Sequence, residues 1–260
     1  MAYETLRLEY DGPLATITLA RPEKRNVISP RMIDEVVGAL DELEGSASRI
    51  GILTGAGKAF CAGMDLEVLR TISSQTAAQN LQDSRRMAEL FRRLWSFPKV
   101  LIAAVNGAAL AGGCAMATLP DFTLAAPEAT FGYTEVRIGF VPAIVSVFLR
   151  RRVGEGRARD LILTGRIFGA EEAQRLGLVN EVVPGEQLMK RARELAGVLL
   201  ANSPASLVAS KKLLVESEEP AIDREISLAI EANAAVRATA DFQEGVASFL
   251  EKRKPRWSGE

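Results

Sequence analysis

The order of apolar and polar residues predicts strands and helices in turn over the first two thirds of the chain. Apolar and polar residues alternate in Tyr3–Tyr10 and Leu14–Ala20, on either side of the turn Asp11–Pro13, which predicts a β-hairpin. The next segment, Ser29–Gly45, starts with Ser29 at the N-cap position, continues with a proline and apolar residues at helical spacing, and ends at a glycine. These signals predict one amphipathic helix.

Two short apolar runs follow this helix along the chain. Arg49–Gly55 and Lys99–Gly107 are rich in Ile and Val and end at glycine, as buried strands of a largely parallel sheet do. Each run leads into a loop that contains glycine and then into a helical segment. The pattern therefore predicts an α/β fold.

From Glu171 onward the pattern is almost wholly helical. The segment Pro204–Lys254 contains helices with apolar faces but no strands for those faces to cover, which predicts a partner subunit. We therefore divide the chain into a core, residues 1–203, and a C-terminal helical trimerisation region, residues 204–260. The expected helical segments after Glu171 lie in Ala170–Gly177, Glu186–Asn202, Pro204–Glu219, Ile222–Ala240 and Phe242–Lys254.

Length and charge limit the class of protein. The 260 residues are 48% hydrophobic, enough for a large domain with its own core. The net charge of -1 provides no overall field to attract nucleic acid or an anionic membrane. No apolar run approaches the roughly 20 residues of a membrane span, and Met1–Tyr10 lacks a signal-peptide pattern. We expect a cytoplasmic protein without nucleic-acid or membrane partners.

The chain contains no histidine. This excludes a Ser-His-Asp or Cys-His hydrolase and a histidine-ligated metal centre, so we expect no metal. The cysteines, Cys61 and Cys114, form no CxxC pair and indicate neither a disulfide framework nor a zinc site. Without a histidine to form a thiolate, we favour buried structural cysteines over a thiol nucleophile. Proton transfer then falls to a carboxylate, Lys, Tyr or Cys.

Two junctions between strands and loops are the strongest candidates for chemistry. Gly57–Leu66 follows one apolar run and Gly107–Met116 includes the end of the other, with Gly112 and Gly113 adjacent. Glycine permits a backbone in which N–H groups at the start of a helix point outward without an acceptor, where they can stabilise an oxyanion. The alternative is a pair of tight βα turns with glycine for close packing.

Five segments resemble, in order, the successive signatures of the crotonase, or enoyl-CoA hydratase/isomerase, superfamily. The resemblance implies a spiral of ββα turns with a C-terminal helical extension, a homotrimer or dimer of trimers, and an acyl-CoA thioester as substrate. It implies no cofactor beyond the coenzyme A that is part of the substrate. The segments are Arg21–Ser29, Gly55–Leu66, Ala103–Pro142, Ala158–Pro184 and Phe242–Trp257.

By position, the resemblance also implies the catalytic groups. The N–H groups of Met64 and Gly112 would form the oxyanion hole, and Glu135 would be the acid/base. Hydratases of this family carry a second Glu at the position of Ala115, so one carboxylate is absent here. The apolar neighbours of Glu135 are expected to raise its pKa. An ordinary surface Glu is the alternative.

The missing carboxylate leaves the reaction open. We favour an enoyl-CoA hydratase-type lyase that adds water to a 2-enoyl-CoA; a Δ3-Δ2 enoyl-CoA isomerase, a thioester hydrolase and a non-catalytic acyl-CoA-binding member are the alternatives. The segment Val141–Ser146 replaces a Gly-rich stretch of many hydratases and resembles members that act on branched or dicarboxylic substrates such as methylglutaconyl-CoA. Leu69–Pro98, which is expected to cover the acyl pocket, is polar at its start, as a mobile segment is.

The resemblance assigns further residues to coenzyme A. Lys24 and Arg25 would contact the nucleotide end, with a solvated charge cluster as the alternative. Phe249 and Lys252 would reach the coenzyme A of the neighbouring subunit, although a solvated basic helix end explains Lys252 equally well. For Asp65, a helix cap is the simpler explanation. The remaining substrate-binding candidates implied by the resemblance are Val27, Ala62, Asp65 and Leu66.

Overall fold

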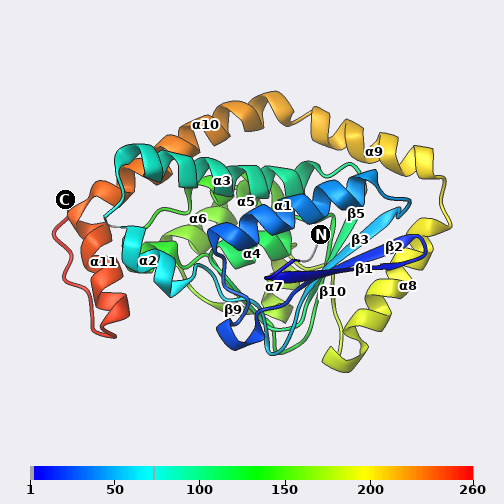
Figure 1. Ribbon diagram of the computed structural model, residues 1–260, viewed down its shortest axis with the longest axis horizontal. Helices are drawn as coiled ribbons and strands as arrows, with labels where there is room; N and C mark the ends of the chain where they lie inside the picture. Colours follow the sequence, from blue (N-terminus) through cyan, green and yellow to red (C-terminus); the bar gives the residue numbers. More distant parts are fainter. Residues whose placement is uncertain (1–2, 73, 260) are drawn as a thin grey trace.

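The computed structural model describes residues 3–72 and 74–259, and within them the chain forms two β-sheets surrounded by helices (Figure 1). The larger sheet has the strand order β1-β2-β3-β5-β7-β10, and the smaller sheet has the order β4-β6-β8-β9. The strands of the larger sheet are β1 (Leu6–Asp11), β2 (Leu14–Leu19), β3 (Ile50–Gly55), β5 (Val100–Val105), β7 (Phe122–Ala125) and β10 (Glu181–Val182).

The larger sheet follows the apolar pattern closely. β1 and β2 form the predicted antiparallel hairpin, with Leu6 opposite Leu19. The two apolar runs form β3 and β5, which pair in parallel as predicted. β2, β7 and β10 extend the parallel part of this sheet, and β7 was not predicted as a strand. β10 was missed, because its two residues lie in a region with a helical pattern.

The smaller sheet was not predicted from the sequence. Its strands β4 (Ala59–Cys61), β6 (Ala108–Leu110), β8 (Thr130–Gly132) and β9 (Phe168–Gly169) have two or three residues each, too few to show a period. β4, β6 and β8 pair in parallel, and each follows a strand of the larger sheet along the chain. A helical segment comes next in each case, so the chain is a spiral of ββα turns.

The helices of the core cover these sheets. The predicted helix is α1 (Pro30–Gly45), and the Ser29 hydroxyl accepts the Met32 N–H at 3.2 Å as its N-cap. Ser73, in the segment predicted to be mobile, lies outside the described residues. The other core helices are α2 (Leu66–Ile72), α3 (Ala77–Ser96), α4 (Gly112–Thr118), α5 (Ala143–Val153), α6 (Glu155–Thr164), α7 (Ala170–Leu176) and α8 (Leu188–Leu200), with 3-10 turns η1 (Pro22–Lys24), η2 (Glu135–Ile138) and η3 (Gly185–Gln187).

The C-terminal helices run along the outside of the core and return to it (Figure 1). They are α9 (Pro204–Glu216), α10 (Glu219–Ala235), η4 (Val236–Ala238) and α11 (Ala240–Leu250). The expectation of uncovered apolar faces is only partly correct. α10 buries Ile222 and Ile226 against α3 and α5 within the same chain, whereas Leu213, Leu214 and Leu228 are exposed.

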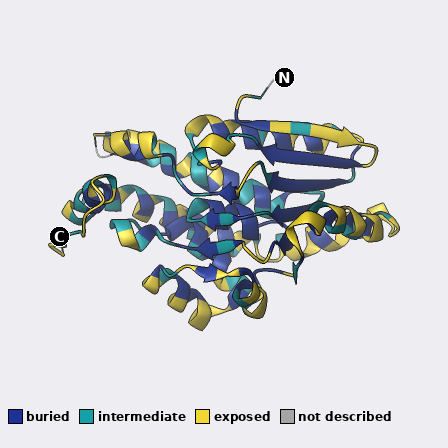
Figure 2. Cartoon of the chain, turned by 90° about the horizontal axis from the view of Figure 1, so that it is seen from below, coloured by how far each residue is buried: buried dark blue, intermediate teal, exposed yellow. Residues whose placement is uncertain are grey.

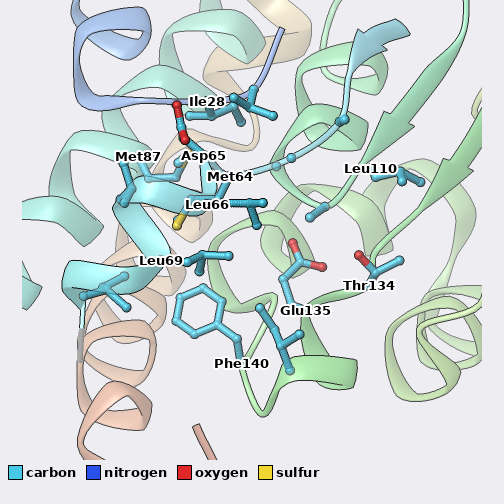
Figure 3. Close-up of a pocket in the computed structure, with 18 of the residues that line it drawn as sticks. Ile28, Met64, Asp65, Leu66, Leu69, Met87, Leu110, Thr134, Glu135 and Phe140 are labelled. Carbon is cyan, nitrogen blue, oxygen red and sulfur yellow. The ribbon is translucent and has the colours of Figure 1, made fainter. Parts of the chain in front are cut away.

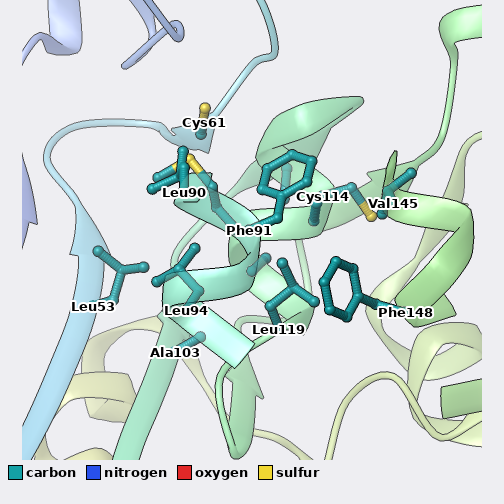
Figure 4. Packing of buried hydrophobic residues seen from close by; sticks show 14 of the residues in the cluster. Leu53, Cys61, Leu90, Phe91, Leu94, Ala103, Cys114, Leu119, Val145 and Phe148 are labelled. Carbon is teal, nitrogen blue, oxygen red and sulfur yellow. The ribbon is translucent and has the colours of Figure 1, made fainter. Parts of the chain in front are cut away.

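The core lies between the sheets and the helices. Buried residues fill the centre of the molecule, and exposed residues gather on the outer helices and on the edge strand near the N-terminus (Figure 2). Leu53 of β3, Phe91 and Leu94 of α3, Leu119 after α4 and Phe148 of α5 belong to the largest apolar cluster (Figure 4). This packing fixes the inner strands from which the site is built.

Among the described residues, no single helix is both long and apolar enough to cross a membrane. The segments Gly185–Leu200 and Pro204–Glu216 reach that length only together, and they are bent by 102° at the break between them.

Candidate active site

Three neighbouring strands of the smaller sheet deliver the predicted catalytic groups to one edge. Met64 follows β4, Gly112 follows β6 and Glu135 follows β8, and these strands are parallel neighbours. Because the carboxyl ends of parallel strands lie at the same edge of a sheet, the three residues come together there, and all three line one cavity. The second sheet, which the sequence pattern did not reveal, therefore organises the site.

The loop after β4 is held in an extended conformation by Ile28. The Ile28 N–H donates to the Gly63 carbonyl at 2.7 Å, and the Asp65 N–H donates to the Ile28 carbonyl at 2.9 Å. Since successive peptide groups of an extended chain point to opposite sides, the Met64 N–H points away from Ile28. Within the described part of the chain, this N–H has no acceptor.

The loop after β6 places Gly112 at the first position of α4, as predicted. The preceding residue, Ala111, has φ 49° and ψ -125°, an unfavourable conformation for a residue with a Cβ, and its N–H donates to the Gly132 carbonyl at 2.7 Å. The Gly112 N–H has no acceptor among the described residues. This strained turn therefore leaves a second backbone donor free beside the cavity.

The two glycines of this loop have different roles. A Cβ on Gly113 would stand 2.2 Å from the Cys61 carbonyl oxygen, so Gly113 is required for the close packing of α4 on β4. A Cβ on Gly112 would meet the end of the Ile28 side chain at 2.9 Å, which can shift. Close packing therefore explains Gly113, whereas the oxyanion role of Gly112 stays a prediction.

Glu135 lies at the start of η2 with its carboxylate directed into the cavity (Figure 3). The residue is 8% exposed, and its Oε2 has no hydrogen-bond partner. Burial raises the pKa of this carboxyl from 4.5 to about 7, in the direction that its apolar neighbours predicted. The alternative interpretation of Glu135 as an ordinary surface residue is therefore wrong.

The cavity has a volume of about 890 Å³ and is mostly apolar around Glu135. Leu69 and Phe140 lie near Glu135, with Thr134 on its other side, whereas Met87 lines a more distant part of the cavity (Figure 3). The lining includes residues of α2 and α3, so the segment that follows the Met64 loop does cover the cavity, as expected.

Ala115 and the two cysteines belong to the core. Ala115 is fully buried and is not among the residues that line the cavity, so a larger side chain there would have to displace its neighbours. Cys61 and Cys114 are also fully buried, and burial raises the pKa of each thiol to about 12. The structural interpretation of both cysteines is therefore confirmed.

Lys24 and Arg25 both line the mouth of the cavity but differ in their partners. The Lys24 ammonium lies 2.9 Å from a Glu67 carboxylate oxygen and 3.9 Å from Asp65. Arg25 is exposed, and its guanidinium has no ion pair or hydrogen bond among the described residues. Arg25 is therefore a cation of the lining that remains available to an anionic ligand, as are the exposed Arg70 and Arg137.

Asp65 acts as a helix cap. Its carboxylate accepts the Glu67 N–H at 3.0 Å in the first turn of α2, and it lies 3.6 Å from the Arg21 guanidinium. Asp65 nevertheless lines the cavity, together with the other predicted substrate-binding residues Val27, Ala62 and Leu66.

The predicted residues of α11 separate in the structure. Phe249 lines the cavity of its own chain, whereas Lys252, just beyond the helix, is not among the lining residues. Their predicted contact with the coenzyme A of a neighbouring subunit stays a prediction.

Sequence reasoning missed a polar wall of the cavity, formed by Asp83 and Arg86 of α3, Asn233 of α10 and Arg237 of η4. A signal was present: the buried stripe of α10 runs through Ile222, Ile226 and Ala229 and continues with Asn233 and Arg237 at the same spacing. Polar residues that continue an apolar stripe indicate a buried polar site.

No group of three or more Asp, Glu, Cys or His side chains able to hold a metal ion occurs in residues 3–72 and 74–259.

Comparison with known proteins places these features in context. The family model described as enoyl-CoA hydratase/isomerase matches residues 9–260. A Thermus thermophilus protein assigned to the enoyl-CoA hydratases is 44% identical over 247 residues, which cover 95% of this chain and 98% of the relative. The crotonyl-CoA hydratase of Syntrophomonas wolfei is 36% identical, with 98% of each chain covered. The crystal structure of an enoyl-CoA hydratase/isomerase from Xanthobacter autotrophicus Py2 superposes with a TM-score of 0.88 at 29% identity and covers 97% of this chain and 98% of that one.

Proposed function

Because this chain belongs to the enoyl-CoA hydratase/isomerase family, we propose that it adds water to the double bond of a 2-enoyl-CoA thioester, with Glu135 as its single acid/base. The observation that carries the proposal is the buried Glu135 carboxyl, whose Oε2 is unpartnered, in the same cavity as two backbone N–H groups without acceptors. Coenzyme A is part of the substrate, and the reaction requires no further cofactor.

The two N–H groups supply the electrophilic half of the reaction. The thioester carbonyl oxygen accepts hydrogen bonds from Met64 and Gly112, which draws electron density from the conjugated double bond and makes C3 electrophilic. As the enolate forms, negative charge collects on this oxygen. Fixed backbone donors in a cavity shielded from water stabilise such a charge by about 3 kcal/mol each.

Glu135 supplies the proton transfers. Its carboxylate takes a proton from water as the water oxygen bonds to C3, and the resulting carboxylic acid returns a proton to C2 of the enolate. The net change is the addition of one water, and the carboxylate is regenerated. A pKa of about 7 suits this role, because neither protonation state is strongly favoured near neutral pH.

Double-bond migration is the second candidate, and the buried Ala115 favours it. In this reaction the Glu135 carboxylate removes a proton from C2 of a 3-enoyl-CoA, and the acid returns one to C4. The same oxyanion donors hold the intermediate, and no second carboxylate is required.

Absorbance of the conjugated thioester separates the two candidates. Hydration of crotonyl-CoA removes the conjugated band, whereas isomerisation of 3-hexenoyl-CoA creates it. Hydrolysis of either ester instead releases a thiol that a colorimetric reagent detects. We expect hydration to dominate and Glu135→Gln to reduce it by roughly 100-fold or more, the usual cost of losing a general acid/base.

The matched control is Glu23→Gln, another carboxylate at the mouth of the cavity, which is exposed to solvent and is expected to keep its turnover. Near-normal hydration by Glu135→Gln would show that another residue moves the proton. Release of thiol as the only activity would show that the reaction itself is different.

A further inference from the structure

The polar wall of the cavity contains a buried and poorly partnered guanidinium. Arg237 is 4% exposed and lines the cavity. Its Nε has no hydrogen-bond partner, and its Nη atoms make only long contacts: 3.3 Å to the Asn80 Oδ1, 3.4 Å to the Asn233 Oδ1 and 3.5 Å to the Gln75 Oε1. The nearest Asp83 oxygen is 3.6 Å away.

Lys211, the other buried cation among the described residues, is better partnered. The Lys211 ammonium lies 2.6 Å from an Asp121 carboxylate oxygen and 2.8 Å from the Lys99 carbonyl oxygen. Arg152 also has an Nε without an acceptor, but it does not line the cavity. A buried guanidinium with an unpaired donor is costly, and a ligand in the cavity that Arg237 lines can supply an acceptor.

Phe140 connects Arg237 to the reacting end of the cavity. The Phe140 N–H donates to the Glu135 carbonyl at 3.0 Å, and the Arg237 Cζ lies 5.6 Å from the centre of the Phe140 ring. An acyl chain that reacts beside Glu135 and extends along this ring is therefore directed toward the guanidinium.

We propose that the acyl group of the substrate ends in a second carboxylate, which Arg237 binds through its Nε and an adjacent Nη. This substrate class, a short dicarboxylic 2-enoyl-CoA, rests on the proposed function. A carboxylate matches the planar donors of a guanidinium with two parallel hydrogen bonds, whereas a methyl end leaves the Nε–H unpaired. The Asp83 carboxylate, which accepts from the Gln75 Nε2 at 2.9 Å, opposes the incoming charge.

Substrate pairs of equal chain length test the proposal. We compare glutaconyl-CoA with 2-pentenoyl-CoA and 2,3-dehydroadipyl-CoA with 2-hexenoyl-CoA, and we expect a higher kcat/KM for the dicarboxylic member. Arg237→Gln should lower this dicarboxylic-to-monocarboxylic ratio by about 10- to 100-fold, the range for a charge-assisted hydrogen bond. Asp83→Asn should raise the ratio, because it removes the opposing charge.

A matched control separates recognition from helix packing. Arg92 also joins α3 to α10, through ion pairs with Glu219 and Asp223, but does not line the cavity. Arg92→Gln is expected to leave the ratio unchanged. If Arg237→Gln does not fold, the wild-type ratio and the Asp83→Asn variant still decide the outcome.

Binding of saturated esters separates this inference from the proposed reaction. Calorimetry with adipyl-CoA and hexanoyl-CoA requires no turnover, and we expect the dicarboxylic ester to bind more tightly. Tighter binding without hydration of any substrate would support the ligand class and overturn the proposed reaction. Hydration of the monocarboxylic esters with equal or weaker binding of adipyl-CoA, or a ratio that neither variant changes, would overturn the inference and leave the reaction intact.

Discussion

At the scale of single residues, the burial of Glu135 links activity to stability. The folded chain raises the pKa of this carboxyl from 4.5 to about 7, so the folded state keeps the proton over a pH range in which the unfolded chain releases it. The favourable contribution of this carboxyl to the free energy of unfolding is therefore fully present below about pH 4.5. It is lost as the pH rises to about 7. Tyr133 and Cys114, which interact with Glu135, stay neutral over this range because burial raises their pKa values as well.

We therefore predict that Glu135→Gln becomes more stable relative to wild type as the pH rises. The difference in unfolding free energy between the two proteins should change by up to about 3 kcal/mol from pH 4.5 to 7.5. Urea unfolding at several pH values measures it, with Glu23→Gln as the exposed control. Parallel stability profiles for wild type and Glu135→Gln would contradict the buried, high-pKa carboxyl.

A second residue-scale prediction concerns the mouth of the cavity. Arg25 has no partner among the described side chains, whereas Lys24 is paired with Glu67. If Arg25 contacts a phosphate of coenzyme A, Arg25→Ala should weaken the binding of free coenzyme A and of every acyl-CoA alike, by about 1 to 2 kcal/mol. Lys24→Ala should have a smaller effect, because that side chain must first leave its carboxylate. Calorimetry that finds unchanged affinity for Arg25→Ala would assign Arg25 to the solvated surface.

Single residues also show where prediction from sequence ends. Glu135 was identifiable through its resemblance to a family signature, and the direction of its pKa followed from its apolar neighbours. Arg237 was not identified, because it belongs to no matched motif and continues an otherwise apolar stripe of α10. Whether the Nε–H of its side chain has an acceptor depends on which residues surround it in the folded chain, and the order of apolar and polar residues does not give that.

At the scale of elements, glycine contacts hold α11 against the turn that carries Glu135. A Cβ on Gly245 of α11 would stand 2.3 Å from the Ile138 carbonyl group, and one on Gly139 would stand 2.5 Å from the Asp241 carbonyl oxygen. Helix and turn therefore touch through their backbones. Phe242 and Val246 complete the contact by packing with Leu69 of α2.

We predict that Gly245→Ala loosens this contact. The added methyl meets backbone that cannot move away, so we expect the free energy of unfolding to fall by about 1 to 3 kcal/mol. We also expect a lower kcat, because η2 positions Glu135. The matched control is Gly38→Ala in α1, where a Cβ meets nothing within 4 Å and a gain of about 0.5 to 1 kcal/mol is expected. Thermal unfolding and turnover are measured on both variants. A stabilised and fully active Gly245→Ala would contradict the tight docking of α11.

The elements differ in how well the sequence predicts them, for a physical reason. β2, β3 and β5 have six residues each. This length is enough for their sequences to show either alternating apolar and polar residues or a continuous apolar run. β4, β6 and β8 have three residues each and exist because the spiral brings them side by side. The smaller sheet depends on contacts between segments far apart in the sequence, so local propensity does not reveal it.

At the scale of the whole molecule, the outer surface of α9 and α10 exposes large apolar side chains. Leu213, Leu214 and Leu228 are 70%, 72% and 63% exposed, although α10 covers its inner face within the chain. Large apolar side chains exposed on a helical surface are typical of a contact between subunits. The prediction of a homotrimer or a dimer of trimers therefore now concerns this surface rather than the whole C-terminal region.

We predict that replacing both Leu213 and Leu214 with Glu produces monomers, because each subunit would bury two unpaired carboxylates in an otherwise apolar contact. Light scattering at micromolar concentration should find three or six subunits for wild type and one for the double variant. Leu163→Glu is the matched control: Leu163 is 71% exposed but lies on α6, so this variant should keep the wild-type mass. A wild-type monomer would contradict the assembly itself, whereas an intact oligomer in the double variant would move the contact to another surface. Dissociation by Leu163→Glu would show that the contact extends to α6.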